Sequence, residues 1–290
     1  VSNGTDFSAM FLISEGASIF NQDISEWDVS NGNDFGWMFY GSEVFNQDIS
    51  EWDVSNGTNF RYMFSGAESF DQDLSSWTLS ENSTLTSMFA GADLMQSQQG
   101  VGDTPSIYYF NPFPDKTTLQ TAIDAWIDDQ GAAKELYGDI NKWDVSQITD
   151  FSELFKDKRS FNSDIGDWDV SAGTDFSEMF YNTEAFNQDI SNWDVSNGTN
   201  FSEMFYNTEA FNQDIGGWDV GAGTNFSWMF THADEFNQDI DGWDVGNGTD
   251  FSFMFAASNF NQDISSWDVS NGTDFTSMFS STYAFNQDIG

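Results

Sequence analysis

The chain carries a tandem repeat in which tryptophan returns every 25 residues. Nine tryptophans follow this period, with a 24-residue step at the end: Trp27, Trp52, Trp77, Trp143, Trp168, Trp193, Trp218, Trp243 and Trp267. One unit, residues 186–210, reads Phe-Asn-Gln-Asp-Ile-Ser-Asn-Trp-Asp-Val-Ser-Asn-Gly-Thr-Asn-Phe-Ser-Glu-Met-Phe-Tyr-Asn-Thr-Glu-Ala. A unit this short cannot bury its own apolar side chains, whereas stacked units bury a continuous core. The repeat therefore predicts a solenoid.

The spacing inside the unit predicts how each coil is built. Residues 190–195 follow the L-x-x-L-x-L pattern of leucine-rich repeats, in which the last part is a short strand. Alternation along that strand would turn Trp193 and Val195 inward. Residues 201–205 place Phe, Met and Phe at i, i+3 and i+4, which predicts one helical or 3₁₀ turn. We therefore expect a leucine-rich-repeat-like solenoid of short parallel β-strands and helical or 3₁₀ turns.

One segment interrupts the period. Residues 96–135 hold all three prolines and an amphipathic helix that Asp115 or Thr117 can cap. Its apolar positions are Leu119, Ala122, Ile123, Trp126 and Ile127. The expected organisation is a first array over 1–95, a loop and junction helix over 96–135, and a second array over 136–290. Two arrays that meet at a capped junction are favoured over one array with a helix inserted on its flank.

The units resemble the BspA-like, DUF285-type leucine-rich repeats of bacterial, protist and viral surface proteins. That family's unit is close to F-N-Q-D-I-S-x-W-D-V-S-x-V-T-x-M-x-x-M-F, and the resemblance covers residues 1–95 and 136–290. A Phe replaces the family's first Met, glycine stands at most positions where the family has Val, and only Ile148 keeps a β-branched residue there. These glycines are Gly4, Gly32, Gly57, Gly173, Gly198, Gly223, Gly248 and Gly272. The resemblance implies an extracellular or cell-surface, non-enzymatic protein with an adhesive or structural role.

Composition excludes several classes of function. With 7 basic and 48 acidic residues the net charge is −41, which opposes binding to nucleic acid or to an anionic membrane. The chain has no cysteine, so thiol catalysis, disulfides and zinc–thiolate sites are excluded. No apolar run approaches the length of a membrane span, so we expect no direct membrane insertion. Six of the seven basic residues lie within 116–159. They either relieve local repulsion or form a collar that docks on another acidic array.

The acidic residues form two columns along the solenoid. The first includes Asp164 and Asp189 and precedes each strand; the second includes Asp169 and Asp194 and lies on it. Carboxylates one coil apart repel by about 1 kcal/mol even in water. Either solvent and backbone N–H groups at turns offset this repulsion, or Ca²⁺ bridges neighbouring coils. The candidate calcium ligands are Asp169, Asp194, Asp219, Asp244 and Asp268. No other cofactor is expected.

Two further columns suggest surface chemistry. The glycosylation sequons, usable in a eukaryotic host, are Asn3, Asn56, Asn82, Asn197, Asn200, Asn225, Asn247 and Asn271. A threonine column, broken at Asn33 and Ser83, makes ice binding a minor alternative. The outward strand positions form an acidic contact face that includes Glu26, Asp28, Asp53, Asp144 and Asp167.

We expect no enzymatic activity. The single histidine, His232, has no Ser-His-Asp set around it, and carboxylate pairs are too numerous to indicate a glycosidase. The favoured function is a structural or adhesive solenoid, a subunit or segment of a cell-surface fibre or adhesin. Joined tail to head with about three added residues the repeat would run on, so head-to-tail self-association is expected, or else a cell-surface partner. The alternative is a module that binds a protein or glycan ligand on its acidic strand face.

Overall fold

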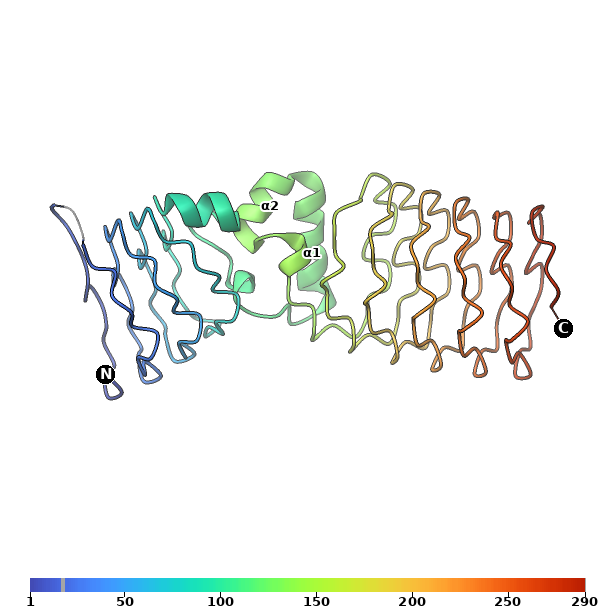
Figure 1. Ribbon diagram of the computed structural model, residues 1–290, viewed down its shortest axis with the longest axis horizontal. Coiled ribbons are helices and arrows are strands. Elements are labelled where there is room, and N and C mark those ends of the chain that lie inside the picture. Colours follow the sequence, from blue (N-terminus) through green and yellow to red (C-terminus); the bar gives the residue numbers. More distant parts are fainter. Residues whose placement is uncertain (17–18, 290) are drawn as a thin grey trace. The chain divides into compact units, whose positions relative to one another are not determined.

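The chain forms stacked coils of about one repeat each, which confirms the predicted repeat solenoid. The structure is a computed structural model that describes residues 1–16 and 19–289 (Figure 1). Within each of its parts, successive coils lie side by side, and side chains one repeat apart meet in a continuous core.

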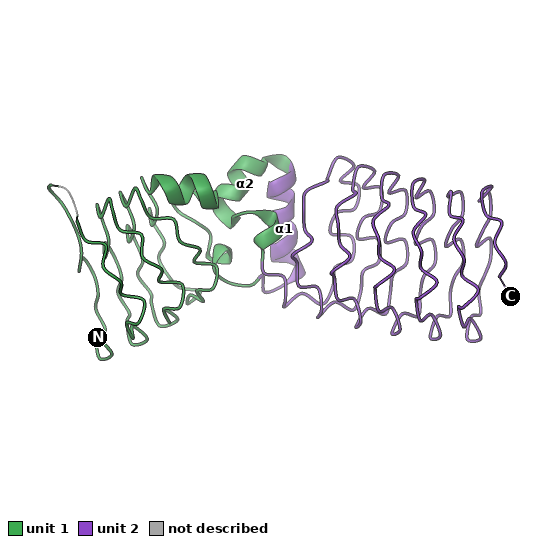
Figure 2. Cartoon of the chain, in the orientation of Figure 1, with its two compact units in different colours: residues 1–112, 128–143 green, residues 113–127, 144–290 purple. Residues whose placement is uncertain are grey.

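The coils belong to two compact units (Figure 2). The first consists of Val1–Pro112 and Asp128–Trp143, and the second of Phe113–Ile127 and Asp144–Gly290. The polypeptide passes between the units three times, so the inserted segment contributes to both of them. Each unit therefore contains a run of coils together with its own part of the insertion.

The regular helices of the described chain lie between residues 95 and 142, a range that we call the inserted segment and that is wider than the predicted 96–135. They are η1 (a π-helix, Met95–Gln99), η2 (3₁₀, Ile107–Tyr109), α1 (Lys116–Asp128), α2 (Gln130–Tyr137) and η3 (3₁₀, Ile140–Lys142). Asp115 caps α1 by accepting the Thr118 N–H at 2.8 Å. The apolar spacing predicts α1 but not α2, which Asp129 begins by accepting the Ala132 N–H. None of the described helices is long and apolar enough to span a membrane.

Helices cover one end of the coil stack in each unit. In the second unit, α1 buries an apolar face, and Trp126 Nε1 donates to Ser163 Oγ at 3.0 Å. In the first unit, Phe110 packs on Trp77 with 6.4 Å between ring centroids. The Ser106 N–H joins this irregular layer to α2 by donating to Leu136 O at 2.7 Å. Amphipathic covers of this kind shield apolar side chains that a solenoid end would otherwise expose.

Aromatic columns form the core. Phe180 and Phe230 stack on the two sides of Phe205, each with a 5.6 Å centroid distance. The indoles of Trp193 and Trp218 lie 6.5 Å apart with their planes 4° from parallel. All these rings are buried. Segments one period apart therefore lie directly on each other, as the 25-residue period predicts.

The predicted strand at 193–195 is wrong, although its side-chain pattern is right. Trp193 and Val195 are buried, but the backbone around them closes on itself in turns. The Trp193 N–H donates to Ile190 O at 3.1 Å, and the Gly198 N–H donates to Val195 O at 2.8 Å. Because these N–H and C=O groups bond within their own coil, they cannot form the hydrogen bonds of a β-ladder with a neighbouring coil. Parallel β-pairing in the described residues is limited to isolated bridges at another position of the repeat. Examples are Asp150–Asp175, Asp175–Asn200 and Asn200–Asn225.

The predicted helical turn at 201–205 is also wrong. The Met204 N–H donates to Phe201 O at 3.3 Å, but Glu203 between them has φ of 57°. A left-handed third residue is typical of a type II β-turn and is incompatible with a right-handed helix. A second such corner follows, where Asn207 has φ of 52°. The i, i+3, i+4 spacing buries the same side chains in either conformation, so it did not distinguish them.

These turns align peptide groups along the solenoid. Four alternate N–H groups of one coil donate to carbonyls of the following coil at 2.8–3.0 Å: Phe201 to Asn225, Glu203 to Ser227, Phe205 to Met229 and Asn207 to Thr231. Two other columns run the opposite way, as in the bonds from Thr199 to Thr174 O and from Ala210 to Glu184 O. The coils are therefore joined by hydrogen bonds with a net direction.

Side chains add a second set of bonds between coils. The Asn187 Oδ1 accepts the Asn212 N–H at 3.0 Å and Gln213 Nε2 at 2.8 Å, and this pattern recurs along the array. Trp218 Nε1 donates to Ile190 O at 3.1 Å. The Asn-Gln pair and the tryptophan of each unit therefore join coils by hydrogen bonds as well as by packing.

The glycine column and the phenylalanine that follows it depend on each other. A Cβ at Gly198 would lie 2.4 Å from Phe201 Cζ and 2.9 Å from Val195 O. The phenylalanine ring thus fills the space into which a larger side chain would project. Phe151 nevertheless follows Ile148 with both side chains buried, so the contact favours glycine in the other coils but is not obligatory.

We predict that Gly198→Val lowers the free energy of unfolding by about 1–3 kcal/mol because it overpacks this contact. Phe201→Met should also destabilise the protein, since it removes part of a buried ring. The double variant should lose less than the sum of the two, because the smaller side chain leaves room for the valine. Urea unfolding followed by tryptophan fluorescence measures all three, and additive effects would contradict this account.

Candidate functional site

The acidic columns lie on the surface as a series of turns capped by aspartate. The Asp194 Oδ1 accepts the Ser196 N–H at 3.0 Å, and Asp189 in the first column caps Ser191 in the same way. The five candidate calcium ligands are all exposed, and each accepts the N–H two residues on: Asp169, Asp194, Asp219, Asp244 and Asp268. One oxygen of every carboxylate in this set is therefore committed to its own turn.

These hydrogen bonds favour the ionised carboxylates. The pKa of Asp194 is lowered most by the hydrogen bond from the Ser196 hydroxyl and next by that from the Ser196 N–H. The pKa of Asp268 is lowered by hydrogen bonds from the N–H and the hydroxyl of Ser270. Among the described residues, no group of three or more His, Asp or Glu side chains is arranged to hold a metal ion. The calcium site stays a prediction, while turn capping accounts for the arrangement of each aspartate.

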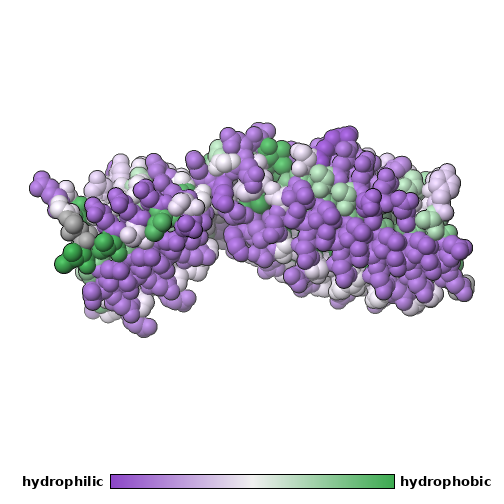
Figure 3. Space-filling view, turned by 45° about the horizontal axis from the view of Figure 1, so that its top comes forward, coloured by the Kyte–Doolittle hydropathy of each residue, from purple (hydrophilic) through white to green (hydrophobic). Residues whose placement is uncertain are grey.

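The predicted contact face is solvent-exposed in both units. Its members Glu26, Asp28, Asp53, Asp144 and Asp167 are all exposed. Three of them cap turns by accepting the N–H of Ser30, Ser55 and Ser146. Figure 3 shows that the visible outer surface of the coils is mostly hydrophilic.

The structure places the sequon asparagines in two environments. Six of the eight are exposed: Asn3, Asn56, Asn82, Asn197, Asn247 and Asn271. Asn200 and Asn225 are half-buried, and each accepts the serine N–H two residues on. In the neighbouring threonine column, Thr199 Oγ1 donates to Thr174 O at 3.1 Å, so the hydroxyl hydrogen is used between coils.

Most of the basic side chains bind acids of their own unit. Ion pairs join Lys116 to Asp150 at 2.9 Å, Lys134 to Asp139 at 3.0 Å, Lys158 to Asp124 at 2.8 Å, Lys156 to Glu153 and Glu178, and Arg159 to Glu184. The hydrogen bond to Glu178 raises the pKa of Lys156 to about 12. These contacts favour local relief of repulsion over a docking collar.

The single histidine occupies a turn position. His232 is exposed, has φ of 56°, and presents an edge-on contact to Tyr206 at 6.0 Å. It corresponds to Asn207 one coil earlier and to glycines such as Gly66 in the first array. The repeat therefore explains its place as a corner of the coil.

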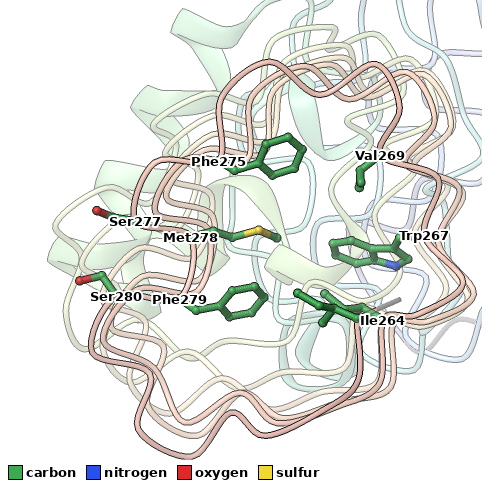
Figure 4. A pocket seen from close by; sticks show the side chains of 9 residues that line it. Ile264, Trp267, Val269, Phe275, Ser277, Met278, Phe279 and Ser280 are labelled. Atoms are coloured by element: carbon green, nitrogen blue, oxygen red, sulfur yellow. The ribbon is translucent and has the colours of Figure 1, made fainter.

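One end of the coil stack presents an apolar hollow and a row of N–H groups, which we call the amide end face. The hollow has a volume of 410 Å³, and Trp267, Phe275, Met278 and Phe279 point into it while Ser277 points away (Figure 4). Phe275 is 41 % exposed, unlike the buried rings of its column. Four amides of this coil have no acceptor among the described residues: Phe275, Ser277, Phe279 and Ser281.

The first coil presents the complementary row, which we call the carbonyl end face. Four of its carbonyls have no donor among the described residues: Asp6, Ser8, Met10 and Leu12. Val1 and Met10 are 54 % and 47 % exposed there, beside a hollow of 400 Å³. Side-chain patterns cannot find these rows, because backbone groups form them.

We predict that salt stabilises the protein by screening, and that calcium adds nothing specific. Raising NaCl should increase the melting temperature, since the chain carries a net charge of −41. CaCl₂ at equal ionic strength should give the same increase, because each aspartate of the column already caps a turn. Differential scanning calorimetry compares the two salts, with MgCl₂ as a control. A larger rise with CaCl₂ alone would favour calcium bridging.

We predict that Ser196→Ala raises the pKa of Asp194 toward its usual value of about 3.9, because it removes the hydroxyl donor. The lowered pKa stabilises the folded state above the unfolded pKa, and this contribution is lost as pH falls through the folded value. NMR titration of the side-chain carboxyl measures the change. Ser202→Ala is the matched control in the same coil, since that hydroxyl bonds to Asn200, and it should leave Asp194 unchanged.

Comparison with known proteins identifies the family of these repeats. The family described as "Mycoplasma protein of unknown function, DUF285" matches residues 1–101, 128–235 and 218–290. No curated protein and no solved structure matches the chain. The matched segments contain the regular coils of both units, including their tryptophan and phenylalanine columns. The chain therefore belongs to the DUF285 family.

Proposed function

We propose that the chain is a non-enzymatic structural solenoid related to leucine-rich repeats. It acts outside the cell as a subunit or segment of a surface fibre or adhesin, and its copies assemble head to tail. The observation that carries this proposal is that each coil joins the next through axial N–H···O=C bonds of one net direction, which makes the amide and carbonyl faces of a coil complementary. The rows of N–H and C=O groups on them occupy equivalent positions of the repeat.

Repeat equivalence defines how two copies would join. Inside the array, the Phe251 N–H donates to Asp274 O at 2.8 Å. Phe275 corresponds to Phe251 and Asp6 to Asp274, so the Phe275 N–H of one copy would donate to Asp6 of the next. The remaining three pairs follow in the same register, Ser277 with Ser8, Phe279 with Met10 and Ser281 with Leu12.

The stacking of aromatic rings at the two end faces supports the same contact between copies. Phe275 stacks on Phe251 at 5.3 Å, and Phe7 stacks on Phe35 at 5.4 Å, so one column geometry holds at both faces. A joint would pair buried N–H and C=O groups and cover apolar side chains on both copies, and both effects favour association. A head-to-tail contact of this kind builds filaments when its rotation does not close into a ring.

The uniform surface supports a structural role over catalysis or a single ligand site. The second acidic column repeats one residue and one turn from coil to coil, whereas a specific site needs local differences. The alternative of a protein- or glycan-binding module on the acidic face has no contact that distinguishes one coil from the next. Ice binding is disfavoured because the threonine hydroxyls donate between coils.

We predict that the purified polypeptide of residues 1–290 forms linear filaments as its concentration rises. Light scattering after size-exclusion chromatography measures the mass, and negative-stain microscopy identifies the shape. Phe275→Lys should reduce assembly, because it places a charge in the apolar hollow of the amide end face.

Tyr283→Lys is the matched control, since it adds the same charge to the same coil at a side chain that is 95 % exposed. It should leave assembly intact. Thermal melting shows whether both variants keep the fold. A wild-type protein that stays monomeric at high concentration, or equal effects of the two variants, would contradict head-to-tail assembly.

A further inference from the structure

The least regular part of the first unit contains a polar cavity of 230 Å³. We call it the Tyr109 cavity. It lies between the last regular coil of the unit, represented by Asp73, and the inserted segment, represented by Tyr109, Tyr137 and Asp139. Asp73 and Asp139 hold the same place in the repeat, before Leu74 and Ile140. The insertion has therefore opened the stack between two coil positions that would otherwise be neighbours.

Irregular packing shapes the cavity. Tyr109 lies against Gly138, where an added Cβ would approach the ring at 3.0 Å and the backbone has φ of 76°. Burial, and then the nearby carboxylates of Asp73 and Asp71, raise the pKa of Tyr109, so its phenol stays protonated as a donor. Lys134 is held beside the cavity by its ion pair with Asp139. Contacts within the protein therefore hold Tyr109, Lys134 and Asp139 in place around the cavity.

The lining has the chemistry of a sugar site. Aromatic rings come from Tyr109 and Tyr137, and acceptors and donors for hydroxyl groups come from Asp139, Lys134 and Gln98. Two lysines and two aspartates line the cavity, so their formal charges cancel in a chain of net charge −41. A neutral ligand with apolar faces and a rim of hydroxyls matches this mixture of rings and polar groups. The volume is smaller than that of typical drug-sized sites, which suits a single pyranose ring.

Two further hollows adjoin the cavity. One of 280 Å³ shares Asp73 and Ser75 with it and continues over the preceding coil at Asp48. The other, of 530 Å³, shares Lys134 and extends along Gly100. Shared lining residues place the three hollows next to one another, so we expect a ligand longer than one ring to extend from the cavity past Asp73 or past Lys134.

We propose that the Tyr109 cavity and its neighbours bind a neutral oligosaccharide, with one pyranose ring held between Tyr109, Tyr137 and Asp139. The cavity shares no lining residue with the hollows of the two end faces, although Lys142 in its lining holds the repeat position of Glu26 and Asp167 in the contact face. It does not depend on filament formation, and the two proposals can fail separately. The repeat itself supplies neither the tyrosines nor Lys134, so the insertion completes the site beside coil residues such as Asp73.

Saturation-transfer NMR with the polypeptide of residues 1–290 tests the proposal. The probes are cellotriose, tri-N-acetylchitotriose, maltotriose and mannotriose, with trigalacturonate as the acidic comparison. At least one neutral trisaccharide should receive saturation. Titration calorimetry should then show that Asp139→Asn and Gln98→Ala each weaken its binding by about tenfold or more, because each removes hydroxyl contacts.

Asp164→Asn is the matched control, because Asp164 holds the place of Asp139 one coil later and also caps a turn, with Gly166. It should leave binding unchanged, and melting temperatures verify that all variants are folded. The proposal is overturned if no neutral trisaccharide binds at millimolar concentration, or if only trigalacturonate binds. It is also overturned if Asp164→Asn weakens binding as much as both cavity variants do.

Discussion

The axial hydrogen bond between an N–H of one coil and a C=O of the next is the interaction on which this structure depends. In the four columns represented by Glu203 and Ser227, alternate peptide groups point along the solenoid in one direction. Two of the four donors in one coil, Glu203 and Asn207, lie at left-handed corners of the backbone. Each coil then needs a neighbour on both sides, since an unpaired backbone group is costly once it is buried. The helices that cover the coil stacks meet that requirement within each unit, and the proposed head-to-tail assembly rests on the same requirement.

Periodicity limits what the surface can do. A side chain placed once per coil becomes a column, and a column of aspartates such as Asp194 and Asp219 is tolerated because each carboxylate caps its own turn. The outer face is therefore chemically uniform, which suits a structural element. Distinct chemistry appears where the period fails, as at Tyr109 and Tyr137, where the insertion replaces a coil with side chains that occur once.

Side-chain and backbone predictions from the sequence fared differently. The period and the inward positions of Trp193 and Val195 could be predicted, because burial depends on which residues are apolar. The backbone conformations at 193–195 and 201–205 could not be predicted, since the same spacing buries the same side chains in a turn, a strand or a helix. The second inserted helix, α2, was missed because its apolar pattern is short and contains Gly131.

The sequence alone determined that coils stack one period apart, with tryptophan and phenylalanine in the core, because stacking is the one arrangement that buries a repeated apolar set. It also determined the family, because the family model matches the segments that contain these repeated residues. The tertiary structure decided which backbone groups join the coils, and hence the directions of the two end faces. It also decided that Tyr109, Asp73 and Asp139 share one cavity. Those outcomes depend on backbone rotation and on contacts between distant segments, which residue spacing does not encode.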